Sequence, residues 1–327
     1  MIRRTLLAVL TAVGLVAGQP ADAKTKLTFA YVADPTHELY FHAIRSGRVT
    51  SDLIDLEITT ISIPALTQAM LGRQYDIIQA SVVAVPRAVA QGLNVKILHT
   101  AIGRLSPGPT LDLWVKKDSP AKSIHDLKGK QIGVFGLGST ALALMRVALA
   151  KQYGFNSALQ GGDFQFVELP TTAIPGALAS DRIAAGALLY AQVFEAERTG
   201  DFRSVWSAAP DLLRLSGARM VLPVIVGFTE RVEANPALYR EFNRVVTASV
   251  RDAAANKMEW SQMVGQKNNV PPEYLRKILD SVSDFKTPVE EADVKAIDYF
   301  WTAAVSIGLL PSAPPVQSVI WPDAMKP

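Results

Sequence analysis

Residues 126–153 contain the pattern that most restricts the fold of this chain. A charged turn at 126–130 leads into a short apolar run, a glycine loop at 136–138, and apolar residues at helical spacing up to Tyr153. This order predicts a strand, a loop and a helix. Such a loop places the free N–H groups of a helix start at the carboxyl end of a strand, where polar or anionic groups bind well. The sequence therefore predicts an α/β unit with a ligand-binding loop.

Strand and helix patterns alternate along most of the chain. Some expected helices begin at a proline and end at a glycine, as in the segment from Pro64 to Gly72. Regular alternation with short links predicts mainly parallel sheets with helices on both faces. The expected strands cover residues 27–32, 53–61, 75–80, 95–100, 111–116, 132–135, 164–169, 185–190 and 202–206.

The alternation breaks at 104–110, where two prolines and a glycine lie close together. A second alternating series follows, so we interpret the break as a crossing between two α/β lobes. The predicted divisions are a leader at 1–23, a first lobe at 24–112 and 217–327, and a second lobe at 113–216.

The C-terminal part of the chain is predicted to be mainly helical. Asn235, followed by Pro236, is expected to cap one helix, and the run at 287–290 (Thr-Pro-Val-Glu) matches a capping box for another that stops at Gly308. These helices should return to brace the first lobe, with their aromatic residues in its core.

The first 23 residues have the features of a secretory signal peptide. Arg3 and Arg4 precede an apolar run at 6–17, and Ala21-Asp22-Ala23 fits an A-x-A cleavage site. The run is shorter than the roughly 20 apolar residues that span a membrane. We expect cleavage after Ala23 and a periplasmic protein. The alternative is a buried N-terminal helix.

Composition excludes several classes of protein. The chain has no cysteine, which excludes disulfides, thiolate catalysis, cysteine metal sites and a lipoprotein anchor. Its formal net charge of +3 over 327 residues is too small to indicate nucleic-acid binding. We expect a freely diffusing monomer.

Several stretches resemble the periplasmic substrate-binding proteins of ABC importers, in the sulfonate, nitrate and taurine binding group. These stretches are 69–77, 123–134, 138–140 and the helix beginning at Asn235-Pro236. The resemblance implies a type II periplasmic binding fold, in which two lobes, each a mainly parallel sheet flanked by helices, enclose a ligand cleft. It also implies capture of a small organic solute and its delivery to an ABC transporter membrane permease. A sulfonate, a carboxylate and an aromatic or heterocyclic compound all remain open as the solute.

Two segments depart from the pattern of these proteins. Residues 34–38 replace the glycine-rich turn that many of them have after the first strand, and residues 181–185 weaken a Gly-x-x-Asp-Ala motif. The ligand is therefore not fixed by the resemblance.

Polar residues near the carboxyl ends of the expected strands are the predicted ligand contacts, because open α/β sheets bind ligands there. Arg104 could bind an anion with two parallel hydrogen bonds, and Ser139 and Thr140 follow the glycine loop. The predicted ligand-binding residues are Pro35, Thr36, His37, Ser81, Thr100, Arg104, Gly138, Ser139, Thr140, Tyr190 and Gln192.

Two enzyme classes are the alternatives. The run at 136–141 matches the G-x-G-x-x-A dinucleotide fingerprint, which suggests an NAD-dependent dehydrogenase, but Glu168 lies beyond the usual spacing of about 20 residues. The second alternative resembles the pyrimidine synthase of thiamine biosynthesis. That enzyme is intracellular and uses a lysine with pyridoxal phosphate and a histidine, whereas this chain is expected to be exported. No catalytic motif is present, so we expect no enzyme activity and no cofactor.

Histidines are too scattered to predict a metal site. His37 and His42 are about 140° apart around a helix, and His99 and His125 lie in other segments. We therefore expect no bound metal.

Overall fold

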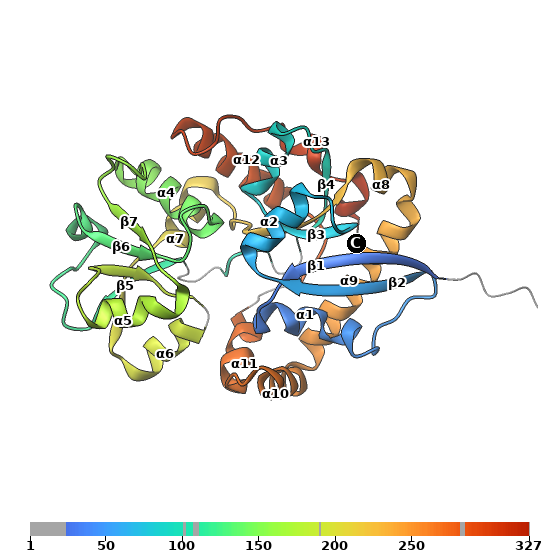
Figure 1. The fold of residues 1–327 in the computed structure, drawn as a ribbon, viewed down its shortest axis with the longest axis horizontal. Helices are drawn as coiled ribbons and strands as arrows, with labels where there is room; N and C mark the ends of the chain where they lie inside the picture. Colours follow the sequence, from blue (N-terminus) through green and yellow to red (C-terminus); the bar gives the residue numbers. More distant parts are fainter. Residues whose placement is uncertain (1–23, 101–102, 107–110, 190, 282–284, 327) are drawn as a thin grey trace, which may run out of the picture.

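The computed structural model describes residues 24–100, 103–106, 111–189, 191–281 and 285–326. Its elements form two groups side by side, each built around one five-stranded sheet (Figure 1). The predicted leader and its cleavage site at Ala23 lie outside the described residues.

The first sheet has the strand order β2-β1-β3-β10-β4. Strand β1 is parallel to β2 and β3, while β10 runs antiparallel between β3 and β4. Together with helices α1–α3 and α8–α13 this sheet forms what we call the first lobe. The strands are β1 (Thr25–Val32), β2 (Ile54–Ile61), β3 (Ile77–Ser81), β4 (Val95–His99) and β10 (Pro223–Phe228).

The second sheet has the order β7-β6-β8-β5-β9. Strand β6 is parallel to β7 and β8, while β5 is antiparallel to β8 and β9. With α4–α7 it forms the second lobe. The strands are β5 (Asp112–Lys116), β6 (Gln131–Val134), β7 (Gln165–Glu168), β8 (Ala185–Ala187) and β9 (Phe202–Ser207).

These two sheets confirm the predicted two-lobed α/β architecture with mainly parallel strands. The antiparallel strand of each sheet is the first strand after the chain crosses from the other sheet, because β5 follows β4 and β10 follows β9. The exact predicted boundaries of the lobes stay a prediction. Strand β8 is shorter than expected, since Leu188 and Leu189 leave the sheet and line a cavity.

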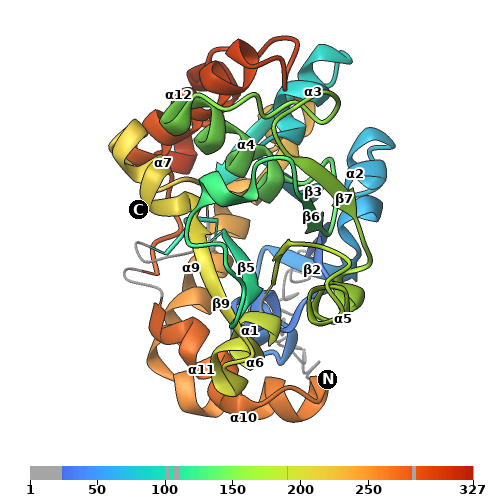
Figure 2. The ribbon, with the colours of Figure 1, turned by 90° about the vertical axis from the view of Figure 1, so that its left-hand side faces the viewer.

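Helices cover both faces of the sheets (Figures 1 and 2). In the first lobe α1 packs on α9, and α12 reaches across to contact α4 and α7 of the second lobe. The helices are α1 (Pro35–Arg45), α2 (Ile63–Leu71), α3 (Ala84–Ala90), α4 (Thr140–Tyr153), α5 (Ile174–Ala179), α6 (Ala191–Thr199), α7 (Ala208–Ser216), α8 (Thr229–Ala234), α9 (Pro236–Ala255), α10 (Lys257–Asn268), α11 (Pro272–Ser281), α12 (Glu291–Ser306) and α13 (Val316–Val319).

An aromatic cluster lies between the first sheet and its helices. The ring of Phe29 lies 5.2 Å from that of Phe41 on α1 and 5.2 Å from that of Phe242 on α9, and all three are fully buried. Edge-to-face contacts at this distance stabilise a core beyond simple burial. Phe300 and Trp301 of α12 are also buried, so the aromatic residues expected in the core lie there.

The expected helix caps need two corrections. Helix α12 begins at Glu291 with Glu290 as its N-cap, and Asp293 accepts a hydrogen bond from the Glu290 N–H (2.8 Å). Thr287, which the sequence analysis made the cap, lies too early and instead hydrogen-bonds to Thr247. Asn235 occupies the expected N-cap position of α9 but makes no side-chain capping bond.

The two crossings between the lobes run side by side. Leu222 N donates to Gly103 O (2.8 Å), and Leu105 N donates to Met220 O (2.9 Å). A Cβ on Gly103 would overlap the carbonyl oxygen of Pro223, so only glycine permits this close approach. These two paired segments are the covalent connections between the lobes.

None of the helices in the described ranges is long and apolar enough to span a membrane.

Candidate ligand-binding site

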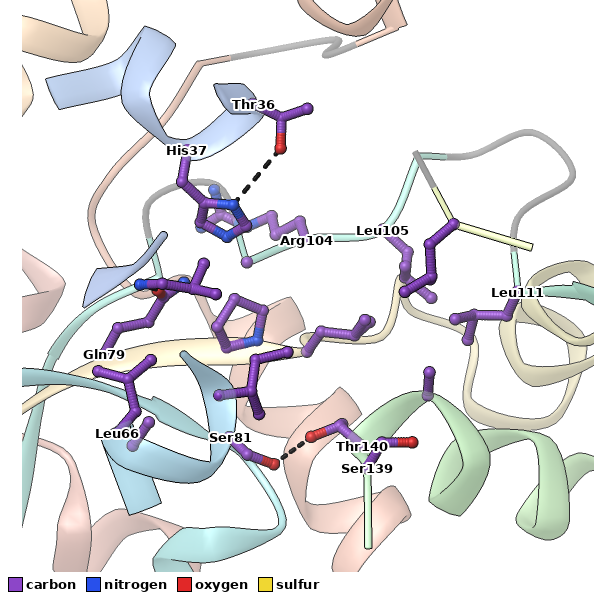
Figure 3. Close-up of a pocket in the computed structure, with 18 of the residues that line it drawn as sticks. Thr36, His37, Leu66, Gln79, Ser81, Arg104, Leu105, Leu111, Ser139 and Thr140 are labelled. Carbon is purple, nitrogen blue, oxygen red and sulfur yellow. Dashed lines mark hydrogen bonds between the residues drawn. The ribbon is translucent and has the colours of Figure 1, made fainter. Parts of the chain in front are cut away.

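A cavity of about 560 Å³ lies between the two lobes. Its walls come from α1, α2, β3, α3 and α11 of the first lobe, and from the loop before α4 and helix α6 of the second. This volume is in the range of small-molecule sites. Figure 3 shows part of the wall, with polar groups near His37, Gln79 and Ser81 and apolar side chains around them.

Most of the predicted contacts lie in this wall. The residues that line the cavity are Thr36, His37, Ser81, Thr100, Arg104, Gly138, Ser139 and Thr140. Among the described residues, Pro35 and Gln192 are not in the lining, because Pro35 begins α1 outside it and Gln192 binds Leu189 N and Thr171 O. Tyr190 lies outside the described residues. A ligand contact for each of these residues stays a prediction.

The glycine loop forms as predicted at the carboxyl end of β6. Ser139 is the N-cap of α4, and its hydroxyl accepts a hydrogen bond from Leu142 N (3.2 Å). Glu168, the acid of the apparent dinucleotide fingerprint, accepts a hydrogen bond from Leu137 N (2.7 Å). This carboxylate therefore holds the loop in place, which is a different use from binding a ribose.

Thr140 joins the two lobes at the edge of the cavity. Its hydroxyl hydrogen-bonds to the hydroxyl of Ser81 at the end of β3 (Figure 3). Thr140 is buried, and Ser81 also accepts from Val83 N (3.3 Å). Two predicted contacts from opposite lobes thus meet directly.

The start of α1 fixes the His37 ring at the cavity wall. Asp34 is the N-cap and accepts from Thr36 N (2.8 Å), while the His37 Nδ1 lies 3.6 Å from its Oδ1. Burial alone would raise the pKa of Asp34, but hydrogen bonds and charge from His37 and hydrogen bonds from Thr36 outweigh it and hold the pKa below its usual range. Asp34 is therefore a carboxylate at neutral pH, and it orients the imidazole.

Arg104 lies in the wall, but its charge is balanced within the protein. The guanidinium donates from Nε to Asp293 Oδ1 (2.7 Å) and from Nη2 to Asp293 Oδ2 (2.6 Å). The side chains of Arg104 and Asp293 are only 8% and 3% exposed. This bidentate pair has the geometry that the sequence analysis expected Arg104 to offer to an anionic ligand.

Gln79 is a polar lining residue that the sequence analysis missed. Its Oε1 accepts from Val32 N (2.9 Å), which leaves the amide NH₂ as the end of the side chain that faces the cavity. Its position inside β3, two residues before Ser81, was the signal that could have identified it.

The apolar part of the lining was also missed. It comes from both lobes and includes Leu66, Met70, Leu105, Leu111, Phe135 and Phe194. Apolar residues on helices and at strand ends look the same in a sequence whether they fill a core or line a cavity. Phe135, directly before the glycine loop, carried the best positional signal.

A further pair of contacts joins α6 to α11 beside the cavity. Lys277 forms an ion pair with Glu197, and the rings of Phe194 and Tyr274 lie 5.6 Å apart. The lobes are therefore in contact on this side as well as at Ser81.

No cluster of three or more metal-binding side chains occurs within the described ranges.

His42 lies 3.6 Å from Glu38, a carboxylate that also binds Lys267 and Asn268 of α10. This arrangement ties α1 to α10.

Comparison with known proteins identifies the family. The NMT1/THI5-like family model matches residues 54–259, more than half of the chain. The chain belongs to the NMT1/THI5-like family. No curated protein sequence matches this chain.

Solved structures share the fold at low sequence identity. The periplasmic aliphatic sulphonate binding protein SsuA of Escherichia coli has a TM-score of 0.72 at 16% identity, covering 91% of this chain and 92% of that chain. The alkanesulfonate-binding SsuA of Xanthomonas axonopodis pv. citri, bound to MOPS, has a TM-score of 0.67 at 18% identity, covering 93% and 99%. A Candida albicans protein with the generic periplasmic binding protein fold has 0.65 at 17% identity, covering 90% and 96%. These matches confirm the periplasmic binding protein fold.

Proposed function

We propose that this chain is an exported solute-binding protein that captures a small organic solute between its lobes and delivers it to the permease of an ABC importer. The observation that carries the proposal is the cavity of about 560 Å³ whose wall is contributed by both lobes. A ligand in such a site contacts both lobes only when they are closed, so it favours the closed state by differential affinity. A permease can then distinguish loaded from empty protein.

The cavity does not support the enzyme alternative better than it supports binding. The pyrimidine synthase alternative needs a lysine that is available to pyridoxal phosphate. Lys277 and Lys286 line the cavity, but they form ion pairs with Glu197 and Glu290. A Schiff base at either lysine would require the loss of an ion pair.

The leader features at 1–23 support export to the periplasm, where several proteins of this fold work according to their names. We propose that the mature chain begins at Lys24 and acts there as a monomer. Size-exclusion chromatography with light scattering tests the monomer.

The function is tested on the mature chain purified from the periplasm. Native mass spectrometry should show a bound solute that is released on denaturation, and adding this solute back should raise Tm in a concentration-dependent way. Absence of any bound solute, together with no Tm shift across sulfonates, carboxylates, aromatic acids and pyrimidines, would contradict solute capture.

A further inference from the structure

We infer that the cavity selects an uncharged, largely apolar solute, and that Asp293 sets this preference by neutralising Arg104. The inference rests on the proposed function, since it takes the cavity between the lobes to be the solute site.

The side chain of Arg104 is hydrogen-bonded on several sides within the protein. Besides the two bonds to Asp293, Nη2 donates to Pro288 O (2.7 Å) and Nη1 donates to Lys286 O (2.8 Å). These bonds use most of the N–H donors of a guanidinium. An anionic solute at Arg104 would have to displace Asp293 or lie beside a buried carboxylate of the same charge, and both are unfavourable.

Further charged groups line the cavity, and two of them are lysines in more exposed ion pairs. Lys277 pairs with Glu197, and Lys286 pairs with Glu290. Asp112, in the wall at the crossing, has a raised pKa because of burial and the nearby charge of Glu197, against hydrogen bonds from Ser207 and Ser204. The two paired lysines and the Asp112 carboxyl therefore offer an anion little attraction at this end.

Two further arginines line the cavity, and their contact with an anion must be tested directly. Arg87 lines the cavity from α3 and is exposed, and Arg219 lines it from the second crossing. Arg87 is exposed and Arg219 is half-buried, so water screens their charge more than that of Arg104.

The polar groups that face the cavity are suited to an uncharged partner. Gln79 offers an amide NH₂, while Ser81 and Thr140 offer hydroxyl oxygens. Such groups can bind a carbonyl, an amide, a hydroxyl or a ring nitrogen. Around them, Leu66, Leu105 and Leu111 provide apolar surface (Figure 3). A ligand with one polar end and an apolar body matches this arrangement.

The test uses two pairs of probes of similar shape and different charge. Benzamide is compared with benzoate, and benzenesulfonamide with benzenesulfonate, by titration calorimetry of the mature chain at neutral pH. We expect the uncharged member of each pair to bind about tenfold more tightly or better, because the charged member loses hydration while the buried cation at Arg104 is already paired with Asp293. Equal or tighter binding of benzoate and benzenesulfonate would overturn the inference. Loss of that binding in Arg87→Gln or Arg219→Gln would then locate the anion site.

The variant Asp293→Asn tests the role of Asp293. An asparagine oxygen can still accept from Glu290 N, but it leaves the Arg104 charge unbalanced. The preference for uncharged probes should shrink or reverse in this variant. The matched control is Asp323→Asn, which removes an arginine-paired carboxylate that is not in the cavity wall, and it should keep the wild-type preference. An unchanged preference in Asp293→Asn, with its melting transition intact, would overturn the assigned role.

Identifying the solute that copurifies with the protein tests the inference independently of the variant and the probes. It applies if Asp293→Asn fails to fold or if none of the four probes binds. A bound compound without ionised groups at neutral pH supports the inference, and a bound carboxylate or sulfonate overturns it. If no solute copurifies and neither the probes nor the wider panel of sulfonates, carboxylates, aromatic acids and pyrimidines shifts Tm, the proposed function itself fails.

Discussion

The hydroxyl of Ser81, at the end of β3, hydrogen-bonds to the hydroxyl of Thr140, the first residue of α4. This bond joins the two lobes directly at the cavity edge. It makes the closed arrangement depend partly on side chains that can also contact a ligand, so closure and binding should be coupled.

Thr140→Val should therefore shift the ligand-free protein toward a more open arrangement. Valine keeps the shape of threonine but removes the hydroxyl that Ser81 binds. Small-angle X-ray scattering should show a larger radius of gyration for the ligand-free variant than for the ligand-free wild type. Ser81→Ala should have the same effect, and the double variant should add little, because both remove the same bond. Additive effects would mean that the two hydroxyls act separately.

The double variant Ser139→Ala/Thr140→Ala should weaken solute binding by roughly tenfold or more, since a lost hydrogen bond to a ligand costs about 1–3 kcal/mol. The fold should remain, because loss of the Ser139 cap on α4 costs about 1 kcal/mol. Calorimetry with the copurified solute measures the first effect, and urea unfolding measures the second. Wild-type affinity would mean that neither hydroxyl contacts the solute, which leaves Ser139 as a helix cap and Thr140 as the partner of Ser81.

The parts of this fold that depend on neighbours in sequence could be predicted. The glycine loop, the N-cap at Ser139 and the alternation of strands each follow from local composition and periodicity. The partner of Arg104 could not be predicted, because Asp293 lies 189 residues away and comes close only through the packing of α12. The cap of α12 was placed wrongly because Thr287 fits a local pattern, whereas its hydroxyl pairs with Thr247 in the folded protein.

Gly103→Ala should destabilise the protein by about 1–3 kcal/mol or more, since the added Cβ overlaps the backbone of the second crossing at Pro223. Urea unfolding should show a lower midpoint. Gly138→Ala is the matched control, because a Cβ there meets no atom within 4 Å. An unfolding midpoint for Gly103→Ala as high as that of Gly138→Ala and the wild type would show that the crossing tolerates a side chain at Gly103.

The stability of the protein should fall as the pH is lowered, in two windows set by His99 and Glu38. Burial lowers the pKa of His99 to about 3, so between its ordinary value near 6.5 and 3 the unfolded chain binds a proton that the folded chain does not. Burial would raise the pKa of Glu38, but hydrogen bonds from His42, Lys267 and Asn268 and the charge of Lys267 outweigh it and hold the pKa at about 2. Below the ordinary value of about 4.5 the unfolded chain therefore binds a proton that the folded chain does not, and stability falls further. Urea unfolding between pH 7 and 3 should therefore show a loss of up to about 1.4 kcal/mol per pH unit from His99. His99→Gln should flatten the slope between pH 6.5 and 4.5, while Glu38→Gln should leave that window unchanged and flatten the slope only below it; the reverse pattern would contradict both assignments.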